Sequence, residues 1–143
     1  MSTSPLLEAY RSLKREIRLI TSTELKRFNL GEKQMLILFL LNERQEASAS
    51  DLAFQTQSDP AAVTRAVQSM EEAGLLERET DSMDNRRFLF KLTPKGKDKA
   101  ESLEVIREEV KRRIEKTLSQ KELKELERLM RTVAKGLLTQ REQ

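Results

Sequence analysis

The stretch DNRRFLFKLTPKG, residues 84–96, combines three local patterns. Its first residues are typical of a turn, its middle alternates like a β-strand, and Thr93 followed by Pro94 is typical of a helix start. Residues 86–97 contain five basic side chains and no acidic one, in a chain otherwise dense in both signs. The stretch therefore predicts a basic hairpin arm that runs directly into a helix.

Composition predicts one mostly helical domain around this hairpin. The chain has 143 residues, of which 36% are charged and 4% aromatic, with four glycines and three prolines. So few helix breakers among so many Glu, Lys, Arg and Leu residues indicate long solvated helices. A core of this size would be lean in large apolar side chains, which is consistent with further burial against a second copy.

The residue inventory excludes several kinds of chemistry. The chain has neither Cys nor His, which excludes disulfides and thiolate metal sites and removes the commonest general base. We find no Gly-rich phosphate loop and no metal-ligand cluster, so we expect no enzyme, no cofactor and no metal. No apolar run is long enough to cross a membrane and no signal peptide is evident, so the expected location is the cytoplasm. The net charge of +3 is too mild to indicate a nucleic-acid partner by itself.

Two short helices are predicted immediately before the hairpin. Ser48 and Asp51 form a capping box that opens a helix ending near Thr56. Asp59 and Pro60 open the next helix, which Gly74 is placed to end. Two such helices joined by about three residues form a helix-turn-helix. The strands of the hairpin are expected at 75–80 and 87–93, with Phe88, Phe90 and Leu92 anchoring the second strand to the core.

The second of these helices would present Ala61, Thr64, Arg65 and Gln68 to solvent. Such side chains can contact base edges or phosphates in a major groove. The segment alone fits an ordinary helical hairpin with a polar outer face equally well. The hairpin favours DNA, because Arg86 and Arg87 at its tip suit the negative potential of a narrow minor groove. Basic residues that merely protect a sheet edge are the alternative.

Both ends of the chain carry narrow apolar stripes on predicted helices. A stripe that repeats every three or four residues is typical of a helix packed against a partner helix rather than over a broad core. A further helix is expected to carry Leu103, Ile106, Val110, Ile114 and Leu118, and residues 139–143 to form a polar tail. The stripe residues at the two ends are Leu6, Tyr10, Leu13 and Ile17, and Leu126, Met130, Val133 and Leu137.

The hairpin stretch resembles the wing of the MarR family (multiple antibiotic resistance regulators), whose pattern is D-x-R, a short strand, then L-T-x-x-G. Asp84, Arg86, Leu92, Thr93 and Gly96 match this pattern at the expected spacing. The order of the other predicted elements is also similar, so the resemblance covers nearly the whole chain. It implies a homodimer with intertwined terminal helices, a recognition helix at 59–73, Arg86 as the minor-groove arginine and Asp84 as the residue that orients the wing.

The resulting expectation is a mainly α fold with a small β-hairpin wing. Residues 1–30 would form an N-terminal dimerisation helix, 31–95 a winged helix-turn-helix, and 96–143 the C-terminal dimerisation helices. The expected function is a dimeric transcriptional regulator, acting as a repressor on a pseudo-palindromic site in double-stranded DNA. A winged-helix adaptor that binds another protein is the alternative. A small-molecule effector is compatible with this expectation, but no residue can be assigned to it.

Overall fold

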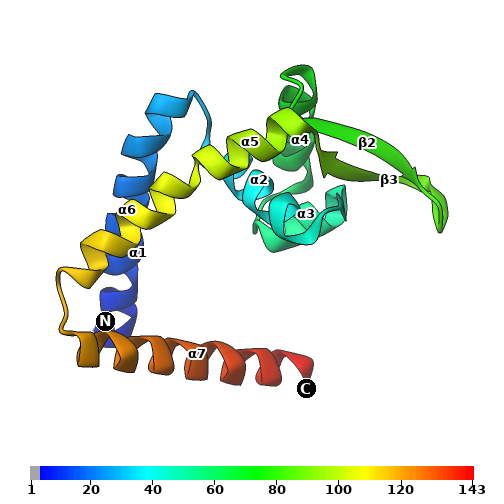
Figure 1. The fold of residues 1–143 in the computed structure, drawn as a ribbon. Helices are drawn as coiled ribbons and strands as arrows, with labels where there is room; N and C mark the ends of the chain where they lie inside the picture. Colours follow the sequence, from blue (N-terminus) through cyan, green and yellow to red (C-terminus); the bar gives the residue numbers. More distant parts are fainter. Residues whose placement is uncertain (1–3) are drawn as a thin grey trace. The chain divides into compact units, whose positions relative to one another are not determined.

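A computed structural model describes residues 4–143 of the chain (Figure 1). Helices dominate it, with one small sheet, which confirms the predicted fold class. In chain order the elements are α1 (Pro5–Leu25), the 3-10 turn η1 (Lys26–Phe28), α2 (Glu32–Arg44), β1 (Ala47–Ser48), α3 (Ala49–Gln55), α4 (Pro60–Glu72), β2 (Leu76–Asp81), β3 (Asp84–Leu92), α5 (Pro94–Ser102), α6 (Glu104–Glu115) and α7 (Gln120–Glu142).

The chain forms two compact units. The first extends to Ile106 and contains the helix-turn-helix and the sheet, while the second is Arg107–Gln143. The boundary falls within α6. Among residues 4–143, none of the helices combines the length and the apolar character needed to cross a membrane.

Capping side chains begin α3, α4 and α5 where the sequence predicted them. Ser48 Oγ accepts a hydrogen bond from the backbone N–H of Asp51 at 3.2 Å, and the Asp51 carboxylate accepts one from Ser48 N–H. Asp59 Oδ1 accepts from Ala62 N–H at 2.9 Å, and Thr93 Oγ1 from Gly96 N–H at 3.0 Å. Because each cap satisfies a backbone donor left unpaired at a helix start, these residues set the boundaries of α3, α4 and α5.

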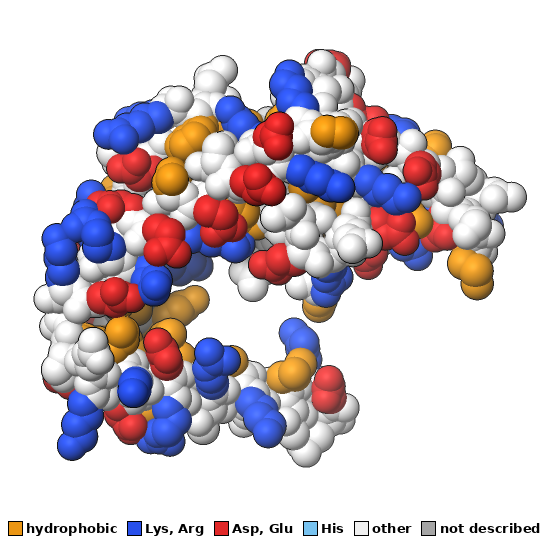
Figure 2. All heavy atoms as spheres, in the orientation of Figure 1, with side chains coloured by type: hydrophobic (Ala, Val, Ile, Leu, Met, Phe, Trp, Pro, Cys, Tyr) orange, Lys and Arg blue, Asp and Glu red, His pale blue; other side chains and the backbone are white. Residues whose placement is uncertain are grey.

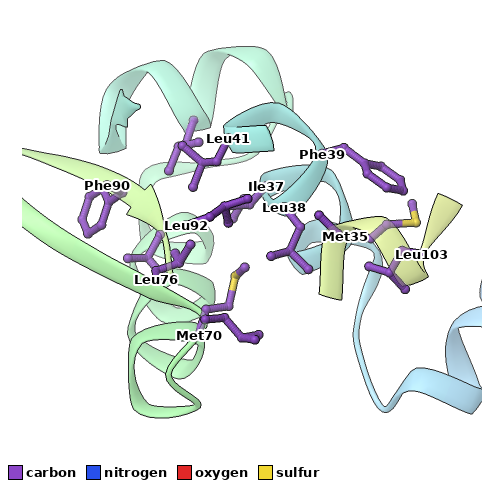
Figure 3. Packing of buried hydrophobic residues seen from close by; sticks show 14 of the residues in the cluster. Met35, Ile37, Leu38, Phe39, Leu41, Met70, Leu76, Phe90, Leu92 and Leu103 are labelled. Atoms are coloured by element: carbon purple, nitrogen blue, oxygen red, sulfur yellow. The ribbon is translucent and has the colours of Figure 1, made fainter. Parts of the chain in front are cut away.

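The core of the first unit lies around α2, whose apolar run is buried on several sides. Ile37 and Leu38 point from α2 toward Met70 of α4 and the strand residues Leu76 and Leu92 (Figure 3). Leu38 has no exposed surface. The same cluster includes Leu103, so the end of α5 is packed onto the helix-turn-helix and the sheet by the same apolar contacts.

The sheet has three antiparallel strands in the order β1–β3–β2. The third strand, β1, was not predicted; it is two residues long and pairs Ala47 with Phe90. The hairpin is also longer than predicted, because β2 reaches Asp81 and β3 begins at Asp84. Arg86 and Arg87 therefore lie in β3, beside the turn rather than in it.

The apolar side of β3 is only partly as predicted. Phe90 and Leu92 are buried, but Phe88 is 45% exposed, so its assignment to the core was wrong. Phe88 lies opposite Thr80 in the outer half of the hairpin, which extends away from the helices of its unit (Figure 1). The core contacts only the inner half of the strand.

Gly96 lets the end of the wing approach the end of α4. A Cβ at this position would lie 2.1 Å from the carbonyl oxygen of Leu75, which no side chain can tolerate. In the same region, Thr93 Oγ1 donates a hydrogen bond to the carbonyl of Gly74 at 2.6 Å, and Gly74 has the positive φ of 77° that glycine adopts readily. The L-T-x-x-G pattern thus has a local physical reason.

Two predictions for the C-terminal part were wrong. The helix predicted to carry Leu103 is divided there, because α5 ends at Ser102 and α6 begins at Glu104. The predicted polar tail belongs to α7, which continues to Glu142. Apolar periodicity did not reveal the division, since Leu103 at the division and Ile106 just after it are both buried.

Candidate nucleic-acid interface

The candidate reading surface is the outer face of α4. Ala62, Val63, Val67 and Met70 are buried on the inner face. The residues predicted to contact DNA are all exposed on the other face: Ala61, Thr64, Arg65 and Gln68. Their spacing of three, one and three residues places them on one side of a helix. The structure thus presents them together, although their contacts with DNA stay predictions.

The N-terminus of α4 is firmly held. The Ala62 N–H that donates to Asp59 lowers the pKa of that carboxylate, so Asp59 stays charged as the cap. Thr64 Oγ1 donates to the carbonyl of Pro60 at 2.9 Å, which leaves the hydroxyl oxygen free to accept a bond from outside. A recognition helix held in this way would approach DNA with its first turn already ordered.

At the wing, Asp84 lies where the resemblance placed it. Its Oδ1 accepts from the backbone N–H of Arg86 at 3.0 Å and lies 3.3 Å from Arg86 Nε. The Arg86 side chain is 92% exposed. A carboxylate that holds both the backbone and the base of the side chain directs the guanidinium outward.

The other wing cations are not free, although the sequence segment that carries them has no acid. Arg87 lies 3.8 Å from both Asp51 of α3 and Asp81 of β2. Lys91 contacts Glu79 at 2.9 Å, which raises the pKa of the lysine. Figure 2 shows basic and acidic side chains interleaved over the visible surface. The acids come from neighbouring elements, so the predicted basic arm is largely neutralised where it joins the body.

A hollow of about 390 Å³ lies between the wing, α4 and the start of α3. Three of the predicted DNA-contacting residues, Thr64, Arg86 and Arg87, line it. Ala61, Arg65 and Gln68 do not. The structure therefore brings part of the exposed face of α4 and the wing arginines to one place, and leaves the rest of that helix face open.

Sequence reasoning missed Arg78, which lines the same hollow. Arg78 Nε donates to Glu71 Oε2 at 2.8 Å, and a second N–H of the guanidinium donates to the other carboxylate oxygen. This pair raises the pKa of Arg78. The guanidinium also lies 4.9 Å from the centroid of the Phe88 ring and 5.3 Å from that of Phe90. The period of two in β2 and β3 could have placed Arg78 on the face of these two rings.

The terminal helices carry apolar side chains that the described chain does not cover. On α1, Leu6, Tyr10 and Leu13 are exposed, Tyr10 by 61%, and Ile17 is half-buried. On α7 no residue is buried at all; Met130, Val133 and Leu137 are exposed, and Leu126 is half-buried. Each stripe is an apolar surface that its own unit leaves largely uncovered.

No group of three or more Asp and Glu side chains within residues 4–143 is arranged to hold a metal ion. The acids near the wing are instead paired with the arginines and lysine described above. The exposed side chains of α4 and the wing offer hydrogen bonds and positive charge to a ligand outside the chain.

Comparisons with known proteins agree with this architecture. The family model described as MarR family matches residues 30–88. The uncharacterized HTH-type transcriptional regulator YdgJ of Bacillus subtilis is 36% identical over 73 residues, which cover 51% of this chain and 44% of YdgJ. The chain thus matches less than half the length of that relative. The HTH-type transcriptional repressor IacR of Pseudomonas putida is 26% identical, over 80% of this chain and 69% of IacR.

The fold is shared with solved structures. The Staphylococcus aureus MepR–DNA complex aligns with a TM-score of 0.78 at 20% identity, and the alignment covers 94% of this chain and 99% of MepR. The matched family model spans the helix-turn-helix and the wing through Phe88, which are the parts whose geometry is described above. Over residues 30–88, which span the helix-turn-helix and most of the wing, the chain matches the MarR family.

Proposed function

We propose that the protein is a dimeric transcriptional regulator that binds double-stranded DNA. The observation that carries this proposal is the hollow in which Thr64 of α4 meets Arg86 and Arg87 of the wing. Placed in a major groove, α4 would present Ala61, Thr64, Arg65 and Gln68 to base edges. The wing would then reach the adjacent minor groove, where an exposed arginine is attracted by the narrow walls.

The uncovered apolar faces of α1 and α7 support a homodimer. A helix of this amphipathic kind gains most of its stability by packing its apolar face, and α7 has no buried residue within the described chain. A second copy offers the same stripes and would cover them symmetrically. Two recognition helices related by a two-fold axis would read half-sites about one helical turn apart, so the expected site is a pseudo-palindrome.

Repression is the expected action, because a dimer seated on promoter DNA excludes other proteins from it. The name of the relative IacR, a transcriptional repressor, is consistent with this action. A small-molecule effector remains unassigned to any residue. The adaptor alternative has less support, since the surface that would serve it is the one where α4 and the wing arginines converge.

The test begins with selection of bound duplexes from a random pool, followed by gel-shift titration. We expect Arg86→Ala to weaken binding to the selected duplex by ~1–3 kcal/mol, because the exposed wing guanidinium would lose its groove contact. Arg27→Ala removes another exposed arginine, on η1 outside the wing, and serves as the matched control with near wild-type affinity. If Arg86→Ala and wild type bind the duplex with equal affinity, Arg86 of the wing does not contact DNA.

Salt titration separates the two candidate functions. Phosphate contacts release counterions, so the logarithm of the DNA-binding constant should fall steeply as the logarithm of salt concentration rises. A protein adaptor would select no duplex and would show no such slope. Failure to recover any enriched duplex would contradict the proposed function as a whole.

A further inference from the structure

Arg78 is held more completely than any other cation described above. Its Nε and one Nη atom donate to the two carboxylate oxygens of Glu71, at the end of α4. Its guanidinium also lies over the rings of Phe88 and Phe90 on the paired strand. An arginine normally loses considerable rotamer freedom when it binds a ligand. Here that freedom is already restricted before any ligand arrives.

Arg78 still has hydrogen-bond donors that the structure leaves available for a ligand. A guanidinium has five N–H donors, and the carboxylate of Glu71 takes two of them. The edge that remains can donate two hydrogen bonds side by side to another oxyanion, which is the geometry that makes arginine a preferred ligand for phosphate. The ion pair with Glu71 therefore orients the guanidinium and leaves one edge of it able to donate to a ligand.

The hollow beside Arg78 has the composition of an anion site. Its lining contains three arginines, Arg78, Arg86 and Arg87, and no acidic residue. The hydroxyl-bearing residues Ser48, Ser50 and Thr64 and the ring of Phe88 complete much of the wall. Carboxylates that pair with these arginines, such as Glu71 and Asp81, do not line the hollow itself.

The position of the hollow indicates which part of a bound duplex would lie in it. If α4 enters a major groove and the wing enters the neighbouring minor groove, the strand that separates the two grooves must pass between them. The hollow lies between these two elements, with Thr64 on one side and Arg86 on the other. The group that this strand presents is its phosphodiester backbone, which carries one negative charge per nucleotide.

We propose that Arg78 donates to a backbone phosphate of the bound duplex in this hollow, with Glu71 and Phe88 as positioning residues that aim its guanidinium. This inference rests on the proposed DNA binding and adds a contact at the junction of α4 and the wing. It also makes Arg78 a link between the two reading elements, since one side chain would bond the recognition helix and the DNA strand that the wing straddles.

The test pairs a protein variant with a DNA modification at a single phosphate. Arg78→Gln keeps an amide that can bond Glu71 but removes the charge. Duplexes that carry one methylphosphonate each, at successive positions of a selected site, locate the phosphate that wild type senses. We expect Arg78→Gln to bind the unmodified duplex about tenfold more weakly, with a salt slope smaller by about one. On the duplex neutralised at the sensed position, both proteins should bind equally.

Lys91→Ala is the matched control, because Lys91 lies on the opposite face of the same hairpin and pairs with Glu79. It should keep the full response to the methylphosphonate. If Arg78→Gln also keeps that response at every position, Arg78 does not contact a phosphate and the inference is wrong. The comparison is between two duplexes with one protein, so a loss of stability in the variant does not decide it.

Glu71→Gln tests the positioning role separately. It keeps Arg78 and its charge but replaces the two-oxygen acceptor, so the response to the methylphosphonate should shrink several-fold while the salt slope is unchanged. An undiminished response would overturn the role of Glu71. Wild-type protein that binds no duplex would contradict the proposed function instead, which keeps the two failures distinguishable.

Discussion

The winged region buries its apolar side chains within the chain, whereas the terminal helices leave theirs exposed. In the winged region, Leu38, Leu52 and Met70 are covered by other parts of the same chain. On α7, Val133 and Leu137 have the same chemical character but remain 59% exposed. The first region is complete as a single copy. Within its own unit, α7 has the stripe of a packed helix without the packing, which supports the proposed homodimer.

The same substitution, leucine to alanine, should lower stability in different ways in the two regions. We expect Leu38→Ala to reduce the free energy of unfolding by about 2–5 kcal/mol, because it opens a cavity in a fully packed core. Urea unfolding followed by circular dichroism measures this loss. Leu137→Ala makes the same change on the exposed stripe, and its cost should depend on protein concentration. A similar, concentration-independent cost at both positions would contradict the comparison.

A charge in the exposed stripe of α7 should dissociate the dimer without unfolding each chain. Val133→Glu places a charge in the expected helix seam, where it would lose water without gaining a partner. We expect sedimentation velocity to show a shift from dimer to monomer at micromolar concentration, with helical content largely kept. Thr139→Glu adds the same charge to α7 at a polar position and should leave the dimer intact. If wild type itself sediments as a monomer at this concentration, the proposed dimer is wrong.

A smaller effect should appear at the start of α4, which belongs to the complete region. The lowered pKa of Asp59 means that the folded state favours its charged form, so its capping contribution is full above the ordinary pKa of the carboxyl and is lost as pH falls through the folded value. We expect Asp59→Asn to show a smaller drop in melting temperature between about pH 7 and about pH 3, since asparagine caps without a charge.

Asp98→Asn is the control for this titration, because Asp98 is an exposed aspartate within α5 that caps no helix. Its melting temperatures should follow those of wild type across the same range. If Asp59→Asn also follows wild type, the cap charge does not contribute to acid sensitivity.

The parts of the fold that depend on neighbouring residues were predictable from the sequence. Ser48, Asp59 and Thr93 mark helix starts through bonds to residues three positions away, so their chemistry is visible in the sequence. The wing and its Asp84 followed from a short motif. The strand β1 was missed because two residues offer no alternation, and its pairing with Phe90 is a contact across more than forty positions.

The charge of the site could not be predicted in the same way. The segment that carries Arg87 and Lys91 has no acid, but Asp51 and Glu79 reach these cations from α3 and β2. The Glu71–Arg78 pair likewise depends on how the end of α4 meets the sheet. Charge along a segment therefore gave a misleading picture of charge in space, whereas the exposed face of α4 was predicted from helical periodicity alone.

In the proposed complex, the terminal helices join two copies so that two α4 helices contact one DNA site. Sedimentation equilibrium of the protein with a selected duplex tests it directly, because the mass of the complex counts the chains. We predict two chains per duplex for wild type, and loss of tight binding for Val133→Glu, whose reading surface is unchanged. A complex of one chain per duplex with full affinity would show that the protein does not bind DNA as a dimer.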